Sequence, residues 1–462
     1  MGLSDRVLQF ELNENYRLLM NPMTGAIDIA PTKLLKTMPE AAQEHFDTRG
    51  YFYSETDRTS QLEILARTAE KQNQNIPYWF YMLTTFDCNF GCGICYEQDL
   101  LKQGKKCLEK KQYADMSSQT VEKIIKTISS FQEEHHLPDS RINTVAFGGD
   151  PLCVKDKNII SQILEASSAH HWKTIIITNG SQINRFIDIF DEYANAISDF
   201  RITLDGPQAI HNIRRPYRGG KGSFNTVIHA IDQLLEKRLS VKMQTIAGAG
   251  NIDAFEELTM FVKKQRWLQH PLFQWRIEGS HDYANLDPEK DELPEGKIVQ
   301  KLIQLWDNNQ ELHGKMKFES FKYLGHIVRS FGWLGEYKTY EGSKYGFCEP
   351  QKGFHYVFST DGAIYHCPRT INNPDFYVGN TAQDMSLKGE LKHKTILEKS
   401  NCAPCSINTL CGGGCLVQKK YYHDFDCQEY ATAIITEFIG LMKDKILEKA
   451  NPEMIVPVNN RW

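Results

Sequence analysis

The stretch CNFGCGICY, residues 88–96, is the best guide to the fold, because it sets Cys88, Cys92 and Cys95 in a C-x3-C-x2-C spacing directly after an apolar, strand-like run. Three thiolates in so short a loop can surround one iron–sulfur cluster. Such a cluster normally takes four cysteine ligands, so three from one loop leave one iron without a protein ligand. A zinc site and three unconnected buried cysteines are the alternatives, and the glycines of the loop do not separate a cluster from zinc.

The spacing resembles the signature of the radical S-adenosylmethionine (SAM) superfamily, C-x3-C-x-aromatic-C. The resemblance implies that Cys88, Cys92 and Cys95 hold a [4Fe-4S] cluster, whose open iron takes the amino and carboxylate groups of SAM. Ile94 stands where the family has an aromatic residue near the adenine. Tyr96, directly after the third cysteine, is counted among the expected SAM contacts.

The length, net charge and apolar runs of the chain limit the class of protein to which it can belong. Its 462 residues predict about three domains, and its net charge of −5 gives no electrostatic argument for nucleic acid or an anionic membrane as a partner. The N-terminus carries Asp5, Arg6 and Glu11 where a secretion signal has an apolar core, and Arg6 disrupts a myristoylation motif. No run reaches the roughly 18 apolar residues of a membrane span. We therefore expect a cytoplasmic protein.

Residues 1–76 are predicted to form a small N-terminal α+β domain. YRLLMNP (16–22) and AIDIAP (26–31) predict a hairpin, and helical stretches follow at about 32–47 and 59–72. One interpretation is a capping subdomain on the main fold. The other comes from resemblance, since many peptide-modifying radical SAM enzymes carry a region similar to this one, in some a winged-helix element that holds a leader peptide.

Residues 77–311 alternate apolar, strand-like runs with amphipathic, helix-like runs. The expected strands are 79–86, 142–149, 173–180, 199–206, 240–248 and 273–280, and the expected helices are 118–135, 156–169, 183–196, 223–237, 252–266 and 295–311. This alternation predicts right-handed crossovers and a parallel α/β sheet. Six units are too few for a closed eight-stranded barrel, so a partly open one is expected. Radical SAM enzymes are similar, with a partial (β/α)6 TIM-like barrel.

Parallel α/β sheets bind ligands at the carboxyl ends of their strands, and polar or glycine-rich residues lie at those ends here. The second strand ends in FGGDPL, the third in TNGS and the fourth in LDGP, and each alone could be an ordinary turn. By resemblance, GGDPL stands where GGEP contacts the SAM amino group, and TNGS and LDGP stand where the family contacts the methionyl carboxylate and ribose. The expected SAM contacts are therefore Gly148, Gly149, Asp150, Pro151, Thr178, Asn179, Ser181 and Asp205.

Residues 211–224, HNIRRPYRGGKGSF, combine several basic residues with glycines. A charged, solvated loop is the default interpretation, and the spacing does not match a Walker P-loop. The stretch is similar to one that lies beneath the active site of radical SAM enzymes. The resemblance implies that Arg215 or Arg218 meets the SAM carboxylate.

A second set of cysteines lies between residues 348 and 427, after an expected helical bridge at 312–347. Its spacing is Cys348-x13-Gly362-x4-Cys367, then Cys402-x2-Cys405-x5-Cys411-x3-Cys415, then Cys427. Neither zinc-ribbon nor single-cluster ferredoxin spacing matches it. In a chain with no secretion signal, such cysteines are expected to be metal ligands rather than disulfides. The pattern resembles the SPASM extension of radical SAM enzymes, which predicts a SPASM domain at 348–430 and a C-terminal helix and tail at 431–462.

The resemblance implies two auxiliary iron–sulfur clusters, expected to be [4Fe-4S]. The outer cluster takes Cys402, Cys405, Cys411 and Cys427, and the inner cluster takes Cys348, Cys367 and Cys415. The inner set is one cysteine short of four. Its fourth iron could take another side chain, water, a substrate thiolate, or Cys107 or Cys153 from elsewhere, although Cys153 is better explained as a small buried side chain near the SAM pocket.

The combined resemblance implies a radical SAM/SPASM maturase, an oxidoreductase that forms a 5′-deoxyadenosyl radical from SAM and oxidatively cross-links a ribosomally made peptide (a RiPP). A thioether or a carbon–carbon bond would fit, and an open inner cluster would favour a thioether. The expected partners are a precursor peptide with a leader sequence and a reductant such as flavodoxin or ferredoxin, with neither nucleic acid nor membrane.

Three other functions stay open. Formylglycine-forming sulfatase maturases resemble this chain, but they carry an aspartate directly after the second SPASM cysteine, where Pro368 stands here. A small-molecule SPASM oxidoreductase is the second. A non-catalytic iron–sulfur electron carrier is the third, and GGDPL argues against it because a carrier needs no SAM pocket.

Overall fold

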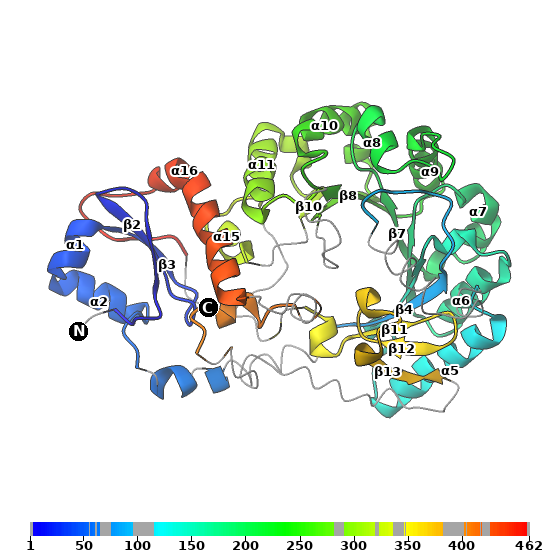
Figure 1. Ribbon diagram of the computed structural model, residues 1–462, viewed down its shortest axis with the longest axis horizontal. Helices are drawn as coiled ribbons and strands as arrows, with labels where there is room; N and C mark the ends of the chain where they lie inside the picture. The colour runs from blue at the N-terminus through cyan, green and yellow to red at the C-terminus, as the bar shows by residue number, and fades with distance from the viewer. Residues whose placement is uncertain are drawn as a thin grey trace.

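The chain forms two bodies joined by its C-terminal helices (Figure 1). The computed structural model describes residues 3–54, 56–60, 62–64, 75–95, 115–280, 291–318, 323–335, 346, 348–381, 402, 404–415, 417 and 426–459. Helix α15 (Cys427–Leu441) stands between the bodies and packs against α11 (Glu295–Asn308) of the larger one. Within the described residues, no helix is long and apolar enough to cross a bilayer.

The larger body is built on a ten-stranded sheet. Its six central strands are parallel and adjacent in chain order: β4 (Tyr78–Thr85), β5 (Ile142–Gly148), β6 (Lys173–Thr178), β7 (Ile197–Thr203), β8 (Val241–Ala247) and β9 (Phe273–Gly279). These match the six strands expected from the sequence. The predicted parallel α/β sheet is therefore confirmed.

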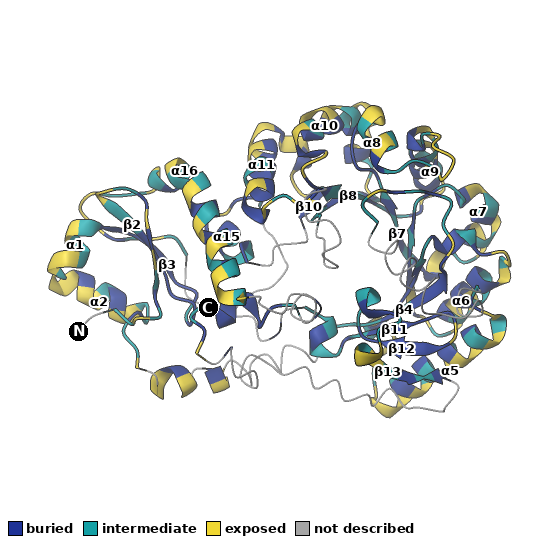
Figure 2. Cartoon of the chain, in the orientation of Figure 1, coloured by how far each residue is buried: buried dark blue, intermediate teal, exposed yellow. Residues whose placement is uncertain are grey.

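The helices between these strands cover the outer face of the sheet, with buried sides inward and exposed sides outward (Figure 2). They are α5 (Ser118–Glu134), α6 (Asn158–Ala169), α7 (Ile183–Glu192), α8 (Gln208–Arg214), α9 (Phe224–Glu236), α10 (Phe255–Lys264) and α11. Helix α5 begins where Ser117 accepts a hydrogen bond from the amide of Thr120, an N-cap that satisfies a free donor of the first turn. Helix α8 is the exception to the prediction, which treated part of its sequence as a solvated loop.

The sheet extends beyond the six predicted strands on both sides. Strand β10 (Met316–Phe318) adds parallel to β9, which corrects the prediction of a wholly helical bridge at 312–347; α12 (Gly325–Ser330) is a helix of that bridge. On the other side, β11 (His355–Phe358) adds parallel to β4, followed by antiparallel β12 (Ala363–Tyr365) and β13 (Tyr377–Asn380). These strands cover edges of the barrel sheet that would otherwise expose unpaired backbone groups.

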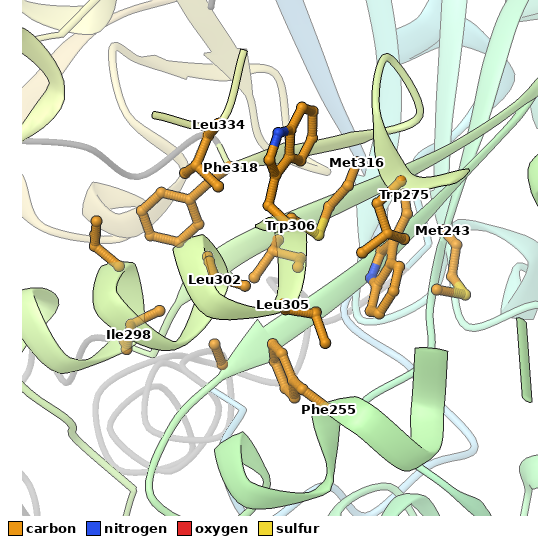
Figure 3. Close-up of a cluster of buried hydrophobic side chains, with 14 of the residues drawn as sticks. Met243, Phe255, Trp275, Ile298, Leu302, Leu305, Trp306, Met316, Phe318 and Leu334 are labelled. Atoms are coloured by element: carbon orange, nitrogen blue, oxygen red, sulfur yellow. The ribbon is translucent and has the colours of Figure 1, made fainter. Parts of the chain in front are cut away.

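One part of the core of the larger body lies between β8, β9, β10 and the helices α10 and α11 (Figure 3). Side chains alternate along a strand, so Met243 and Trp275 face the helices. Trp275 is fully buried, and its indole N–H donates to Thr245 Oγ1 at 2.8 Å, so that its polar atom is satisfied. Truncation of such a side chain to alanine costs about 3–5 kcal/mol.

The smaller body joins the two ends of the chain. Its sheet has the order β1 (Leu8–Glu11), β2 (Tyr16–Met20), β3 (Ile27–Pro31) and β14 (Val456–Pro457), and the predicted hairpin is confirmed as β2 and β3. The helix expected at 32–47 is broken into α1 (Thr32–Thr37) and α2 (Glu40–Thr48), because Met38 is left-handed and Pro39 follows it. No pattern in the sequence predicted that β14 would lie in this sheet.

Candidate functional site

The three-cysteine loop follows β4 and is fixed by the segment after α8. The amide of Gly91 donates to the carbonyl of Pro216 at 2.8 Å, and the amide of Arg218 donates to the carbonyl of Asn89 at 2.9 Å. The rings of Phe90 and Tyr217 meet edge to face at 4.8 Å. A loop this short has no regular structure to hold it, so these backbone contacts set its conformation.

Two of the three loop sulfurs accept hydrogen bonds from side chains. Cys88 Sγ accepts from Asn179 Nδ2 at 3.6 Å and from the amide of Phe90 at 3.4 Å. Cys92 Sγ accepts from Arg215 Nη1 at 3.8 Å. Burial raises the pKa of the Cys88 thiol, and the nearby Asp150 carboxylate adds to this effect. Both donors were expected from the sequence to contact SAM, and here they also contact the cysteines.

Asn179 belongs to a small polar network at the end of β6. Its Nδ2 also donates to Asn89 Oδ1 at 2.9 Å, and its Oδ1 accepts from the amide of Ser181 at 2.8 Å. Asn89 Nδ2 donates to Ser181 Oγ at 2.8 Å. Sequence reasoning missed Asn89, although a polar residue directly after the first cysteine is a signal that could have identified it.

Asp150 of GGDPL is buried and points toward the end of β6. Its carboxylate accepts from Thr178 Oγ1 at 2.9 Å, from the amide of Asn179 at 2.6 Å and from the amide of Leu152 at 3.0 Å. Burial raises its pKa to about 6, against the effect of these hydrogen bonds. The carboxylate therefore joins the ends of β5 and β6.

The two glycines of GGDPL are required by close backbone contact with the end of β4. A Cβ on Gly148, whose φ is +149°, would lie 2.2 Å from the carbonyl oxygen of Thr85. A Cβ on Gly149 would lie 2.4 Å from the carbonyl oxygen of Asp87. The amides of Gly149 and Asp150 donate to these same two carbonyls. Only glycine lets the second strand approach the cysteine loop in this way.

A buried row of alternating charges leads to Cys92. Arg215 Nε donates to Asp205 Oδ2 at 2.6 Å, Arg214 Nε lies 3.5 Å from the same oxygen, and Arg214 Nη2 donates to Asp291 Oδ2 at 2.8 Å. Burial raises the pKa of Asp205, but Arg215 and Arg214 more than offset this and hold it below its usual value. The expectation of a solvated loop is wrong for Arg214, which is buried, because α8 turns it toward Asp205 and Asp291.

The rest of the 211–224 stretch holds Arg215 in place. His211 is fully buried: its Nδ1 accepts from the amide of Asp205 at 3.2 Å, and its Nε2 lies 3.0 Å from Ser223 Oγ. Burial lowers the pKa of His211 to about 4, so its ring is neutral at pH 7. Ser223 Oγ in turn donates to the carbonyl of Arg215. Arg218 is exposed instead and pairs with Asp87 at 3.2 Å.

The second cysteine set separates into two groups of neighbouring thiols. Burial raises the pKa of the Cys348 thiol, and Cys367 and Cys415 raise it further. Burial raises the pKa of Cys405 to about 11, with added contributions from Cys411, Cys427 and Cys402. The two groups contain the same residues as the inner and outer ligand sets expected from the sequence; their roles as ligands remain predictions.

The residues of the three-cysteine loop fit an iron–sulfur cluster. All eleven described cysteines are free thiols. Among the described residues, no three His, Cys, Asp or Glu side chains converge closely enough to hold one ion. A [4Fe-4S] cluster is larger, and its thiolates bind different iron atoms. The donors directed at Cys88 and Cys92 suit such a cluster, because hydrogen bonds to sulfur stabilise thiolates.

Two expected residues lie outside the described part of the chain, and one cysteine lies close to the loop. Tyr96 and Cys107 fall in the undescribed stretch 96–114. Cys153, at the end of the short 3₁₀ turn that follows Asp150, is half-buried, and burial raises its pKa to about 12. It also contributes to the raised pKa of Cys88, so its thiol is a neighbour of the loop.

The smaller body covers the group of thiols around Cys405. Arg58 Nη2 donates to the carbonyl of Cys405 at 3.2 Å, and Met23 and Leu62 pack with Cys402 in one apolar cluster. Thr409 Oγ1 also donates to the carbonyl of Pro22, in the turn between β2 and β3. The sequence did not predict this contact between the N-terminal residues and the second cysteine set.

Comparison with known proteins found one family model and curated relatives that match this chain. The family model described as the radical SAM superfamily matches residues 82–262. The cysteine-type anaerobic sulfatase-maturating enzyme of Clostridium perfringens (strain 13) is 24% identical over 392 residues, which cover 79% of this chain and 95% of that enzyme. The enzyme of the same name from Clostridium novyi (strain NT) is 26% identical over 364 residues, covering 72% and 86%.

Two solved structures share the fold. Native anSMEcpe with bound AdoMet superposes with a TM-score of 0.60 at 18% identity, over 80% of this chain and 99% of that one. Streptococcus suis SuiB bound to S-adenosylmethionine superposes with a TM-score of 0.54 at 14% identity, over 91% of this chain and 97% of that one. At this identity the likeness concerns the fold. Residues 82–262, which contain the three-cysteine loop, GGDPL and the Asp205–Arg215 pair, are a radical SAM domain with the α/β fold of that superfamily.

Proposed function

We propose that the chain is a radical SAM/SPASM maturase that cross-links a ribosomally made peptide by a thioether or carbon–carbon bond. The observation that carries the proposal is the group of three neighbouring thiols, Cys348, Cys367 and Cys415. The second cysteine set offers seven thiols, one fewer than two four-cysteine clusters would need. A cluster held by three thiolates has one iron free for another ligand, as at the SAM site.

At the first site, Cys88, Cys92 and Cys95 would hold a [4Fe-4S] cluster. When bound, this cluster supplies the electron that cleaves SAM into methionine and a 5′-deoxyadenosyl radical. The chain itself positions the reactants. Asp150 fixes the ends of β5 and β6. The residues at these strand ends, Gly148, Gly149, Pro151, Thr178, Asn179 and Ser181, would hold the methionyl group of SAM.

The proposed reaction removes two hydrogens from the peptide. The 5′-deoxyadenosyl radical takes one hydrogen atom from a carbon and becomes 5′-deoxyadenosine. Formation of a carbon–sulfur bond with a peptide cysteine then releases the thiol proton and one electron. An auxiliary cluster held by the second cysteine set would accept this electron, which would replace the electron used to cleave SAM. A flavodoxin- or ferredoxin-like protein is the proposed source of reducing electrons.

Glu349 is the candidate acceptor for the released proton. It directly follows Cys348, and its charge raises the pKa of both the Cys348 thiol and the Tyr81 hydroxyl. Tyr81 lies on β4, on the face of the sheet opposite the helices. Glu349 is therefore near both the inner thiols and the barrel interior, where a peptide would meet the radical.

Formylglycine formation is the second candidate, favoured by the relatives at 24–26% identity. By the family resemblance, that reaction uses an aspartate directly after the second SPASM cysteine. Here Pro368 holds the position and begins a 3₁₀ turn, so no carboxylate is available there. The structural matches do not separate the two reactions: anSMEcpe has the higher TM-score, 0.60 against 0.54, whereas SuiB covers more of this chain, 91% against 80%.

A peptide substrate is consistent with the extra N-terminal body. SuiB, which covers more of this chain, has been solved with its precursor peptide SuiA, and anSMEcpe has been solved with the Kp18Cys and Cp18Cys peptides. We propose that the sheet of β1, β2, β3 and β14, with α1 and α2, holds the leader of the substrate peptide. Its contact with Cys405 through Arg58 joins it to the outer thiol group.

The test uses the reconstituted enzyme, SAM, dithionite and cysteine-containing peptides encoded beside the gene, under anaerobic conditions. Mass spectrometry is expected to show a peptide that has lost two hydrogens. A thioether product no longer reacts with a thiol reagent, whereas a carbon–carbon product still does. Replacement of the thiol sulfur by a carbonyl oxygen would establish the sulfatase-type reaction instead. Unchanged peptides with turnover of a small metabolite would overturn a peptide substrate, and a failure to form 5′-deoxyadenosine would overturn the enzyme assignment.

A further inference from the structure

The hydrogen bonds to Cys88 and Cys92 come from two donors of different charge. Asn179 offers a neutral amide to Cys88 at 3.6 Å, and Arg215 offers a guanidinium to Cys92 at 3.8 Å. Both distances lie within the range for a nitrogen donor and a sulfur acceptor. The donors come from different strand ends, β6 and the segment after β7, so they reach the loop from separate parts of the barrel.

Each donor is fixed by further bonds that leave it little freedom. Asn89 and Ser181 hold the Asn179 side chain. Arg215 is held by Asp205, and Arg214 by both Asp205 and Asp291. The amide of Gly250 also donates to Asp291 at 2.9 Å. Donors that are already oriented lose little conformational entropy when they bond a sulfur. Their hydrogen bonds are therefore suited to affect the reduction potential of a cluster.

We propose that Asn179 and Arg215 set the reduction potential of the cluster at residues 88–95 by stabilising its reduced, more negative state through Cys88 and Cys92. Hydrogen bonds to sulfur, net charge and exposure are the main protein controls on the potential of such a cluster. This inference rests on the proposed function, because it assumes that the three cysteines hold the cluster. It adds that two expected SAM-contact residues act on the sulfurs.

The two donors are expected to differ in strength. Arg215 carries a full positive charge in a buried site, where charge interactions are stronger than in water. Asp205 cancels part of that charge, and Arg214 and Asp291 form a second pair behind it. Removal of Arg215 leaves Asp205 near the cluster with one partner fewer. The potential is therefore expected to fall more for loss of Arg215 than for loss of Asn179.

The test measures the midpoint potential of this cluster by EPR-monitored titration of the full-length, reconstituted enzyme without SAM. The signal is identified in wild type by its change when SAM is added, which separates it from the auxiliary clusters. The variants are Asn179→Ser, Asn179→Asp, Arg215→Lys and Arg215→Gln, each compared at equal iron and sulfide content. Arg201→Gln is the matched control, since Arg201 is also a largely buried arginine paired with an aspartate, Asp199.

The expected result is a lower potential for Asn179→Asp and a still lower one for Arg215→Gln, with Arg215→Lys closer to wild type and Arg201→Gln unchanged. Asn179→Asp keeps the acceptor for Ser181, removes the amide that donates to Cys88 and Asn89, and adds a negative charge; Asn179→Ser removes the same amide without the charge and is expected to lower the potential less. Wild-type potentials in both Asn179→Asp and Arg215→Gln would overturn the inference. Absence of any SAM-responsive cluster in the wild type would instead overturn the proposed function, so the two failures are distinguishable.

Discussion

Arg215 donates from Nη1 to the sulfur of Cys92 at 3.8 Å. This contact joins residues 123 positions apart, and the Arg215 guanidinium reaches it because Asp205 holds its Nε at 2.6 Å. The cysteine loop and the end of the fourth barrel strand are therefore coupled through one side chain. Arg215 and the aspartate behind it therefore belong to the surroundings of the cluster proposed at this loop.

Loss of Asp205 is expected to destabilise the fold strongly. In Asp205→Asn, Arg214 and Arg215 lose the shared carboxylate in a buried site, and an uncompensated buried charge costs about 3–5 kcal/mol. Urea unfolding of the protein checks this. Asp87→Asn removes the partner of Arg218 at the surface and is the control, expected to cost less than about 1 kcal/mol. Equal effects of the two substitutions would contradict the burial argument.

Glycine-to-alanine substitutions should distinguish the strand-end glycine Gly149 from the loop glycine Gly93. Gly149→Ala places a Cβ against the carbonyls of Phe86 and Asp87, at 2.5 and 2.4 Å, so the strand ends must separate. We expect a cost of roughly 1–3 kcal/mol and weaker SAM binding. Gly93→Ala, in the cysteine loop, meets nothing within 4 Å and should leave both unchanged. Thermal unfolding and SAM titration measure the difference; equal melting temperatures would argue against it.

Serine variants of the second cysteine set are expected to behave as two groups. Cys348→Ser, Cys367→Ser and Cys415→Ser should alter one cluster, whereas Cys405→Ser and Cys427→Ser should alter the other, because the thiols are neighbours within each group. Iron analysis and EPR spectra of each variant give the measurement. Identical spectra for Cys415→Ser and Cys427→Ser would show that the grouping is mistaken.

Glu349→Gln should slow peptide modification without loss of the clusters. A general base contributes about 100- to 10,000-fold to a rate, so a large fall in the rate of cross-link formation is expected. Formation of 5′-deoxyadenosine from SAM should change far less, since it precedes the proton transfer. Glu278→Gln, also near Tyr81, is the matched control. A full rate in Glu349→Gln would remove Glu349 from the mechanism.

The stability of the protein should fall in mild acid because of His211. Its pKa in the folded protein is about 4, below the usual value of 6.5, so the unfolded chain binds the proton first as the pH falls. The stabilisation is complete above pH 6.5 and is lost as the pH falls toward 4, by up to roughly 3 kcal/mol. Urea midpoints across this range measure it. His211→Gln should flatten the dependence, and the exposed His171→Gln should not.

The six barrel strands and their helices could be predicted because each has its own hydrophobic periodicity. Strands and helices that alternate through short loops bury their apolar faces by forming a parallel sheet. The 211–224 stretch was misread for a physical reason. Arg214 and Arg215 look solvated in sequence, but helix α8 turns them back toward Asp205, ten residues before Arg215, and Arg214 also pairs with Asp291, 77 residues further along the chain. Strand β10 was missed because three residues are too few to show alternation.

The sequence by itself determined the three-cysteine loop, the strand-end residues and the order of the barrel, since these depend on spacing and local pattern. Tertiary structure alone decided which donors reach Cys88 and Cys92, and that β14 completes the N-terminal sheet. It also brought Arg58 to the carbonyl of Cys405. Such contacts join residues that are distant in the chain. Their partners are chosen by packing and by the need to satisfy buried charges and hydrogen bonds, which no local pattern records.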